Sequence, residues 1–144
     1  MTINEKDRLT LIKYRIEKAR KAAGDADFLV NNDKLELAVN RIYYSAFYIL
    51  TALALKYRFH SSKHQELIGW FNKTFVKQDI VEREFGKFLH KAYDKRSKAD
   101  YADYVNFDRE ELSVMLGEVN NFLDEVEKLI EKDIEFPAGS QTFD

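Results

Sequence analysis

The segment KAYDKRSKADYADY, residues 91–104, holds side chains suited to binding a phosphorylated ligand. The guanidinium of Arg96 presents its N–H donors in a planar fork, which suits bidentate binding of phosphate. Asp100 follows four residues later, so a continuing helix would place its carboxylate on the same face, where it could hold the guanidinium in place. Tyr101 offers a hydroxyl group or a stacking surface for a base. The alternative is structural, because an arginine near the end of a helix also complements the helix dipole.

Arg41 is a second unusual charge, because it opens the most apolar segment of the chain, IYYSAFYILTALALKY at residues 42–57. An unpaired charge is costly to bury. We therefore expect Arg41 to pair with a carboxylate, for which Asp100 and Asp103 are candidates, or to line a polar groove that binds a nucleotide. The buried ion pair is the favoured interpretation.

The histidines do not form a convincing metal site. His60 and His64 are four residues apart, which on one helical face would suit a shared metal ion, but Ser61 and Ser62 between them are typical of a helix start. His90 lies among apolar residues and is more typical of a packed or exposed histidine. The chain has no cysteine and no glycine-rich phosphate loop. We expect neither a metal nor a cofactor.

Apolar residues recur every three or four positions along most of the chain, and no segment alternates for long enough to predict a strand. The pattern predicts an all-α, up-and-down bundle of four to five helices with short connections. Gly24-Asp25 is expected to end the first helix, with a short continuation through Phe28 as the alternative. The expected helices span roughly 5–23 and 33–57, with later ones starting at Ser61-Ser62, Asp79 and Asp108.

The bulk composition bounds the class of protein. A chain of 144 residues, 45% hydrophobic and 33% charged, predicts one soluble domain over residues 1–135, and residues 136–144 are expected to be a disordered tail. The net charge of −2 gives no global attraction to nucleic acid, so such binding would need a local patch. The polar start MTINEKDRLT is not typical of a signal peptide, and no apolar run is long enough to span a membrane. We expect a cytoplasmic protein.

The chain is rich in aromatic residues, which make up 14% of it and crowd the second to fourth expected helices. A bulky core explains most of them. A four-helix bundle cannot enclose every side of a helix as apolar as residues 42–55, however, and leftover apolar surface on a soluble protein usually meets another subunit. We therefore expect a homodimer.

Three segments in this order, AVNRIYYSAFYILTALAL, KHQELIGWFNKTFVKQDI and RSKADYADY, resemble the HEPN superfamily (higher eukaryotes and prokaryotes nucleotide-binding). The likeness runs over about residues 35–129 and is strongest to small stand-alone prokaryotic members. It implies an all-α bundle that is commonly dimeric. Many such proteins are metal-independent ribonucleases, often toxins encoded beside a minimal nucleotidyltransferase that neutralises them. The implied catalytic signature is an arginine followed within about one and a half helical turns by a histidine, with two such motifs facing each other across the dimer.

The chain keeps the arginine of that signature, Arg96, but Tyr101 stands about where the histidine would be. Histidine suits RNA cleavage because its pKa lies near neutrality, whereas tyrosine is a poor base. The branch that this chain resembles usually carries arginine followed by Asp-Tyr, as here. His64 matches a histidine that the branch often has at the start of its third helix. It could supply the missing imidazole, or it could cap and pack locally.

Two functions remain open. In the first, the protein binds nucleotide or RNA and acts as a toxin-type, metal-independent ribonuclease that uses the 2′-hydroxyl as internal nucleophile. In the second, it is a non-catalytic interaction module that dimerises and binds a nucleotidyltransferase-like antitoxin. The near-neutral charge and the missing histidine favour the second, and the cluster of Lys91, Lys95 and Lys98 around Arg96 favours the first. Candidate catalytic residues are Arg96, Tyr101 and His64, and candidate nucleotide-binding residues are Arg96, Asp100, Tyr101 and Arg41.

Overall fold

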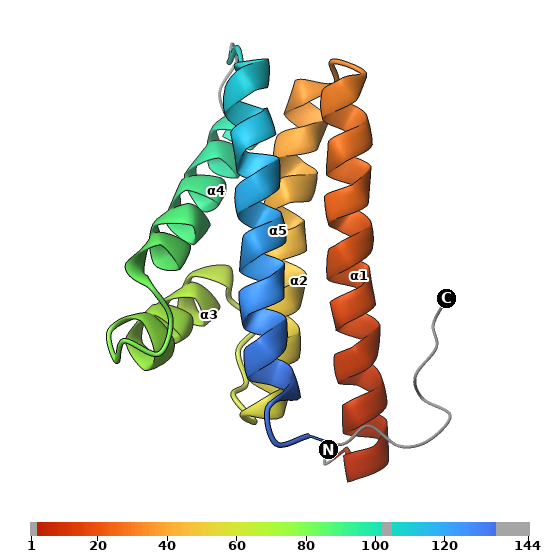
Figure 1. Ribbon diagram of the computed structural model, residues 1–144, viewed down its shortest axis with the longest axis vertical. Coiled ribbons are helices and arrows are strands. Elements are labelled where there is room, and N and C mark those ends of the chain that lie inside the picture. Colours follow the sequence, from red (N-terminus) through yellow and green to blue (C-terminus); the bar gives the residue numbers. More distant parts are fainter. Residues whose placement is uncertain (1–2, 102–104, 135–144) are drawn as a thin grey trace.

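The computed structural model describes residues 3–101 and 105–134, and every regular element in these ranges is helical. The chain rises through α1, descends through α2, rises again through α4 and descends through α5, with the short α3 set across the base (Figure 1). This confirms the expected all-α, up-and-down bundle. The elements are α1 (Glu5–Asn31), α2 (Leu35–Lys56), α3 (His64–Phe71), the π-helical turn η1 (Asn72–Val76), α4 (Arg83–Tyr101) and α5 (Arg109–Glu131).

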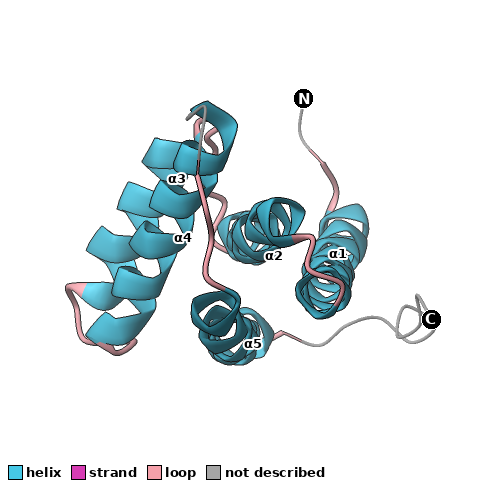
Figure 2. Ribbon diagram, turned by 90° about the horizontal axis from the view of Figure 1, so that it is seen from above, coloured by secondary structure: helices cyan, strands magenta, loops and turns pink. Residues whose placement is uncertain are grey.

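Helix α2 is the centre of the molecule. It contacts α1, α3, α4 and α5, and the view from above shows it between α1 on one side and the α3–α4 pair on the other (Figure 2). Its side chains are apolar around most of the helix, and Ile42, Ile49 and Leu53 are all fully buried. Burial on several sides is what an all-round apolar helix requires.

Two of the expected helix boundaries were wrong. Helix α1 does not end at Gly24 but continues through Phe28, as the alternative had it, and reaches Asn31, because Ala26 and Val30 keep its buried face in contact with the core. That burial outweighs the cost of about 1 kcal/mol for a glycine inside a helix. Helix α4 begins at Arg83 rather than at Asp79, since Asp79 adopts a left-handed conformation with φ 57°.

The other boundaries lie within a few residues of the expected ones. Asp108 is the N-cap of α5, and its carboxylate accepts a hydrogen bond from the backbone N–H of Glu110 at 3.3 Å. Helix α3 begins slightly after the two serines, and the Ser61 hydroxyl accepts from the backbone N–H of Lys63. The expected tail at 136–144 and Asp103 lie outside the described residues.

The turn η1 is an element that the sequence did not predict. It continues α3 and packs against α4. A Cβ atom on Gly86 of α4 would lie only 2.8 Å from Oδ1 of Asn72. Glycine at this position therefore allows α4 to approach the π-helical turn closely.

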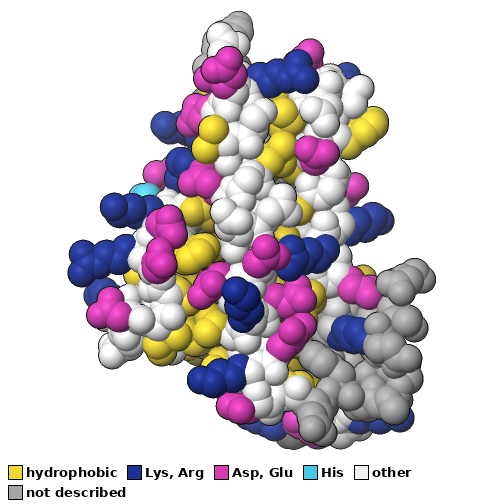
Figure 3. Space-filling model, in the orientation of Figure 1, with side chains coloured by type: hydrophobic (Ala, Val, Ile, Leu, Met, Phe, Trp, Pro, Cys, Tyr) yellow, Lys and Arg dark blue, Asp and Glu magenta, His cyan; other side chains and the backbone are white. Residues whose placement is uncertain are grey.

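The surface carries charges of both signs. On the face shown in Figure 3, basic and acidic side chains intermix over α5, and hydrophobic side chains reach the surface between α5 and α3. None of the described helices is long and apolar enough to cross a lipid bilayer.

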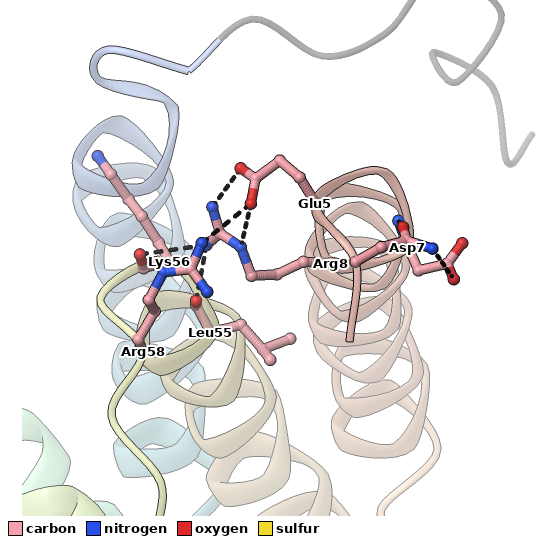
Figure 4. Close-up of polar contacts among 7 residues, drawn as sticks. Glu5, Asp7, Arg8, Leu55, Lys56 and Arg58 are labelled. Carbon is pink, nitrogen blue, oxygen red and sulfur yellow. Dashed lines mark hydrogen bonds and ion pairs between the residues drawn. The ribbon is translucent and has the colours of Figure 1, made fainter. Parts of the chain in front are cut away.

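Two cationic side chains tie the lower helix ends together. Arg8 of α1 is nearly buried and donates from Nη1 to the carbonyl oxygens of Leu55 and Lys56 at 2.8 and 3.2 Å, while its Nε and Nη2 bind the carboxylate of Glu5 (Figure 4). Lys56 in turn donates from Nζ to the carbonyl oxygens of Leu129 and Lys132. Each cation thus satisfies carbonyl groups that a helix C-terminus leaves without partners.

Candidate functional site

Helix α4 aims Arg96 at the central helix. Phe88, Leu89 and Ala92 form the buried face of α4, which packs on α2. Arg96 lies one turn beyond Ala92 on the same face, so its side chain is 21% exposed although it is charged. The helix continues to Tyr101, which fulfils the condition under which Asp100 shares a face with Arg96.

The Arg96 guanidinium has aromatic as well as polar neighbours. Its Nη2 donates to the Tyr44 hydroxyl at 3.1 Å, and its carbon lies 5.5 and 5.4 Å from the ring centroids of Tyr43 and Tyr44. Nε lies 2.9 Å from Oδ2 of Asp100, which is an ion pair by distance. The N–H of Nε does not point along a hydrogen bond, however, and this buried atom has no such partner among the described residues. Cation–π attraction therefore contributes to holding the guanidinium.

Arg41 shares Tyr44 with Arg96. Its guanidinium lies 5.4 Å from the Tyr44 ring centroid, and Nε and Nη2 donate to Oδ1 of Asn40 at 3.0 and 2.8 Å. Among the described residues Arg41 makes no ion pair, so the expected pair with Asp100 is not formed; the other candidate partner, Asp103, lies outside these residues. The physical reason is that Arg41 is only half-buried, and the carboxylate of Asp100 lies beside Arg96 instead.

His64 is the first residue of α3. It packs against the side of α2 that Arg96 also contacts, where Tyr43 and Tyr44 lie. Its Nδ1 is 2.7 Å from the hydroxyl oxygen of Tyr43, and its ring stacks on Phe47 with centroids 3.9 Å apart and planes inclined by 19°. Burial, and then the positive charge of Arg96, lower the pKa of His64 below its ordinary value. The imidazole is therefore mostly neutral near pH 7.

His64 and Arg96 line one open depression, which we call the Arg96 pocket. It has a volume of about 600 Å³. At its rim, Nε2 of Gln65 donates to the Tyr93 hydroxyl at 3.0 Å. The residues lining it are Ser62, Lys63, His64, Gln65, Glu66, Tyr93 and Arg96. The fold therefore brings an imidazole and a guanidinium from different helices to one solvent-accessible site.

The family of the chain follows from comparison with known proteins. The model of the HEPN domain matches residues 12–129. The chain belongs to the HEPN family. It is 40% identical over 129 residues to a "UPF0332 protein" of Thermotoga maritima, covering 90% of this chain and 96% of that one.

Two archaeal relatives carry a functional name. The HEPN chain is 35% identical over 120 residues to "Putative toxin MJ0142" of Methanocaldococcus jannaschii, covering 83% of this chain and 82% of that one. It is 31% identical over 121 residues to "Putative toxin MJ0605" of the same organism, covering 84% and 90%.

Tyr101, which we expected at about the place of the signature histidine, does not join the pocket. It is 83% exposed and is not among the residues that line the depression. Five residues along an α-helix correspond to about 140° of rotation, so Tyr101 points well away from Arg96. The fold of this HEPN domain thus brings three of the candidate residues, Arg96, Asp100 and His64, near one another, whereas Tyr101 lies apart.

The sequence did not single out the aromatic wall of α2 that lies behind His64 and Arg96. Tyr43, Tyr44 and Phe47 of α2 contact His64, and Tyr43 and Tyr44 also contact Arg96. The available signal was the pair of tyrosines inside an apolar helix, because a buried phenol needs a hydrogen-bond partner.

The lysines around Arg96 face away from the pocket. A separate depression of about 770 Å³ is lined by α4, the η1 region and Glu111 of α5, and it includes Lys91, Lys95 and Lys98. Basic side chains gather along this edge in Figure 3. Lys91 pairs with Glu118 and Lys95 with Glu111, each at 2.6 Å. These two lysines are therefore already neutralised.

Among residues 3–101 and 105–134, no group of three acidic, histidine or cysteine side chains could hold a metal ion.

Proposed function

We propose that this HEPN domain binds RNA at the Arg96 pocket and cleaves it slowly without a metal, as a toxin-type ribonuclease. The observation that carries the proposal is the placement of His64 and Arg96 in one open pocket. The names of the two archaeal relatives support a toxin-like role.

Arg96 keeps hydrogen-bonding capacity for a ligand. Among the described residues, Nη1 makes no hydrogen bond and Nη2 makes one, to Tyr44. A guanidinium that is fixed by rings and a carboxylate but still has free N–H groups suits a phosphodiester. Arg41 also contacts the ring of Tyr44 and adds positive charge beside this site. Tyr101, exposed at the end of α4, offers its ring to a base of the bound strand.

The reaction that fits these groups is internal transesterification. The 2′-hydroxyl oxygen attacks phosphorus, the bond from phosphorus to the 5′-oxygen breaks, and the products are a 2′,3′-cyclic phosphate and a 5′-hydroxyl. The proton of the 2′-hydroxyl passes to water, and the leaving 5′-oxygen takes a proton from water. Arg96 stabilises the negative charge that builds up on the phosphoryl oxygens.

The test compares the wild type with Arg96→Ala on total cellular RNA in excess chelator, followed by analysis of the fragment ends. We expect cyclic-phosphate ends from the wild type and a loss of about 100-fold in rate for the variant, the size seen when a charge-stabilising donor is removed. Arg109→Ala is the matched control, because Arg109 lies in an exposed ion pair with Asp33 away from the pocket. RNA left intact by folded wild-type protein would refute cleavage.

A non-catalytic role is the second candidate, favoured by the replacement of the signature histidine by Tyr101 and by the net charge of −2. In that case the protein would form a homodimer and bind a nucleotidyltransferase-like antitoxin. Hydrophobic side chains that reach the surface between α5 and α3 offer such an interface (Figure 3). Light scattering measures the dimer directly, and a monomeric mass at micromolar concentration would contradict it.

A further inference from the structure

Tyr43 holds the His64 imidazole from inside the bundle. The Tyr43 side chain is completely buried, and its hydroxyl lies 2.7 Å from Nδ1 of His64. The two rings are nearly parallel, inclined by 22° with centroids 5.7 Å apart, and Phe47 stacks on the imidazole as well. The ring of Tyr44 also contacts it edge-on, so one hydrogen bond and three ring contacts fix the orientation of the imidazole.

The direction of that hydrogen bond follows from the surroundings of Tyr43. A buried hydroxyl is costly to leave without an acceptor. Among the described residues, Nδ1 of His64 is the one hydrogen-bond partner of this hydroxyl. The Arg96 guanidinium over the Tyr43 ring has donors only. Burial raises the pKa of Tyr43, and Arg96 offsets only part of that rise, so the phenol keeps its proton and donates a hydrogen bond to Nδ1.

A neutral imidazole that accepts at Nδ1 carries its proton on Nε2. We infer that Tyr43 is a positioning residue that fixes His64 as this tautomer, so that His64 donates a hydrogen bond from Nε2 to a phosphate oxygen bound by Arg96. In this arrangement His64 does not take the proton of the 2′-hydroxyl. The inference rests on the proposed function, since it assigns the phosphate of bound RNA as the acceptor.

Tyr43 connects the orientation of His64 to the phosphate-binding group Arg96. The ring of Tyr43 contacts both the imidazole and the guanidinium, so the two ligand-binding groups share a support. A neutral donor beside Arg96 also avoids a second positive charge in the pocket, which agrees with the lowered pKa of His64. Slow cleavage follows, because the pocket then binds the phosphate without supplying a base.

The first test determines the tautomer without any ligand. Nitrogen NMR on the full chain with labelled histidine, at pH 7.5, distinguishes a protonated from an unprotonated ring nitrogen. We expect Nε2 of His64 to be protonated in the wild type, and the proton to be shared between the two nitrogens in Tyr43→Phe, which keeps the buried ring. Tyr93→Phe is the matched control, because the Tyr93 hydroxyl accepts from Gln65 and not from His64. A wild-type His64 protonated on Nδ1 would overturn the role of Tyr43.

The second test separates a donor from a base. The probe is a 2′-O-methyl RNA tetranucleotide, which has phosphodiesters but no attacking hydroxyl. His64→Gln keeps an N–H donor and should weaken binding by less than about tenfold, as should Tyr43→Phe, whereas His64→Leu should weaken it by more than about tenfold. Equal losses in His64→Gln and His64→Leu would contradict a donor at Nε2. His90→Gln, an exposed histidine on α4, controls for the general loss of an imidazole.

The two tests fail independently. No binding of the tetranucleotide by the wild type would refute the proposed function, and with it the phosphate that we assign to His64. The tautomer in the free protein would still decide whether Tyr43 orients the ring. Binding with His64 protonated on Nδ1 would leave the proposed function in place and refute only the inference.

Discussion

Arg8 and Arg96 are both largely buried arginines, with side chains 10% and 21% exposed, but the protein uses them differently. Arg8 directs all three of its nitrogens to protein acceptors, the Glu5 carboxylate and the carbonyl oxygens of Leu55 and Lys56 (Figure 4). Arg96 is held largely by tyrosine rings and one carboxylate, and its Nη1 makes no hydrogen bond among the described residues. Arg8 thus uses its donors within the protein, whereas Arg96 keeps some of them free, as its proposed role in phosphate binding requires.

The largest expected effect in this comparison is that of Arg8→Ala on stability. The substitution removes charged hydrogen bonds that join α1 to the end of α2, so we expect the free energy of unfolding to fall by about 2–4 kcal/mol. Urea denaturation measures it. Arg58→Ala is the control, because Arg58 binds the same Glu5 from an exposed position and should matter much less. Equal losses would show that the carbonyl contacts of Arg8 contribute little.

Lys56→Met should have the next largest effect. Methionine keeps the apolar stem but loses the two hydrogen bonds to the carbonyl oxygens of Leu129 and Lys132, so we expect a loss of about 1–2 kcal/mol in urea denaturation. Lys91→Met removes an ion pair at the surface and should cost less than about 1 kcal/mol. If the order of the two were reversed, the capping role of Lys56 would be refuted.

Arg96→Ala should lower stability by about 1 kcal/mol, less than Arg8→Ala, because the hydrogen bond, ion pair and ring contacts that it removes lie at a partly exposed site and the carboxylate of Asp100 stays accessible to water. The same protein should lose the RNA cleavage described above. A stability loss as large as that of Arg8→Ala would place Arg96 with the structural arginines and remove the contrast between them.

The smallest effect concerns the pH dependence of stability. Burial and Arg96 lower the pKa of His64 in the folded protein, so the unfolded chain binds a proton more readily. The contribution of His64 to stability is therefore complete above about pH 6.5. It is lost as the pH falls through the folded pKa.

As the pH is lowered from 7.5 to 5, the free energy of unfolding should therefore fall more for the wild type than for His64→Gln. Parallel stability curves for the two proteins would contradict a lowered pKa. Arg96→Ala should raise the pKa of His64, which a proton NMR titration can follow, because it removes the nearby positive charge.

The fold could be predicted because its signal is local. Apolar spacing identified each long helix, and the carboxylate of Asp108 marked the start of α5. The misplaced boundaries have tertiary causes. Packing of Ala26 and Val30 carries α1 past Gly24, and the left-handed Asp79 lies in a turn that local helix propensity does not describe.

The site could be predicted only in part. Arg96 and Asp100 lie on one helix, so their spacing was informative. The meeting of His64 with Arg96 depends on how α3 and α4 pack on α2, and no spacing encodes it. Tyr101 was placed by analogy with a histidine motif, but the helical rotation between it and Arg96 turns it outward.

The pocket is assembled from side chains that lie far apart along the chain, and this has a consequence for the order of synthesis. Tyr43 and His64 leave the ribosome well before Arg96 does, and the pocket needs all three of these side chains. A nascent chain that has completed α1, α2 and α3 therefore has the aromatic wall and the imidazole but no guanidinium. The complete pocket therefore forms only once α4 has emerged and packed against α2.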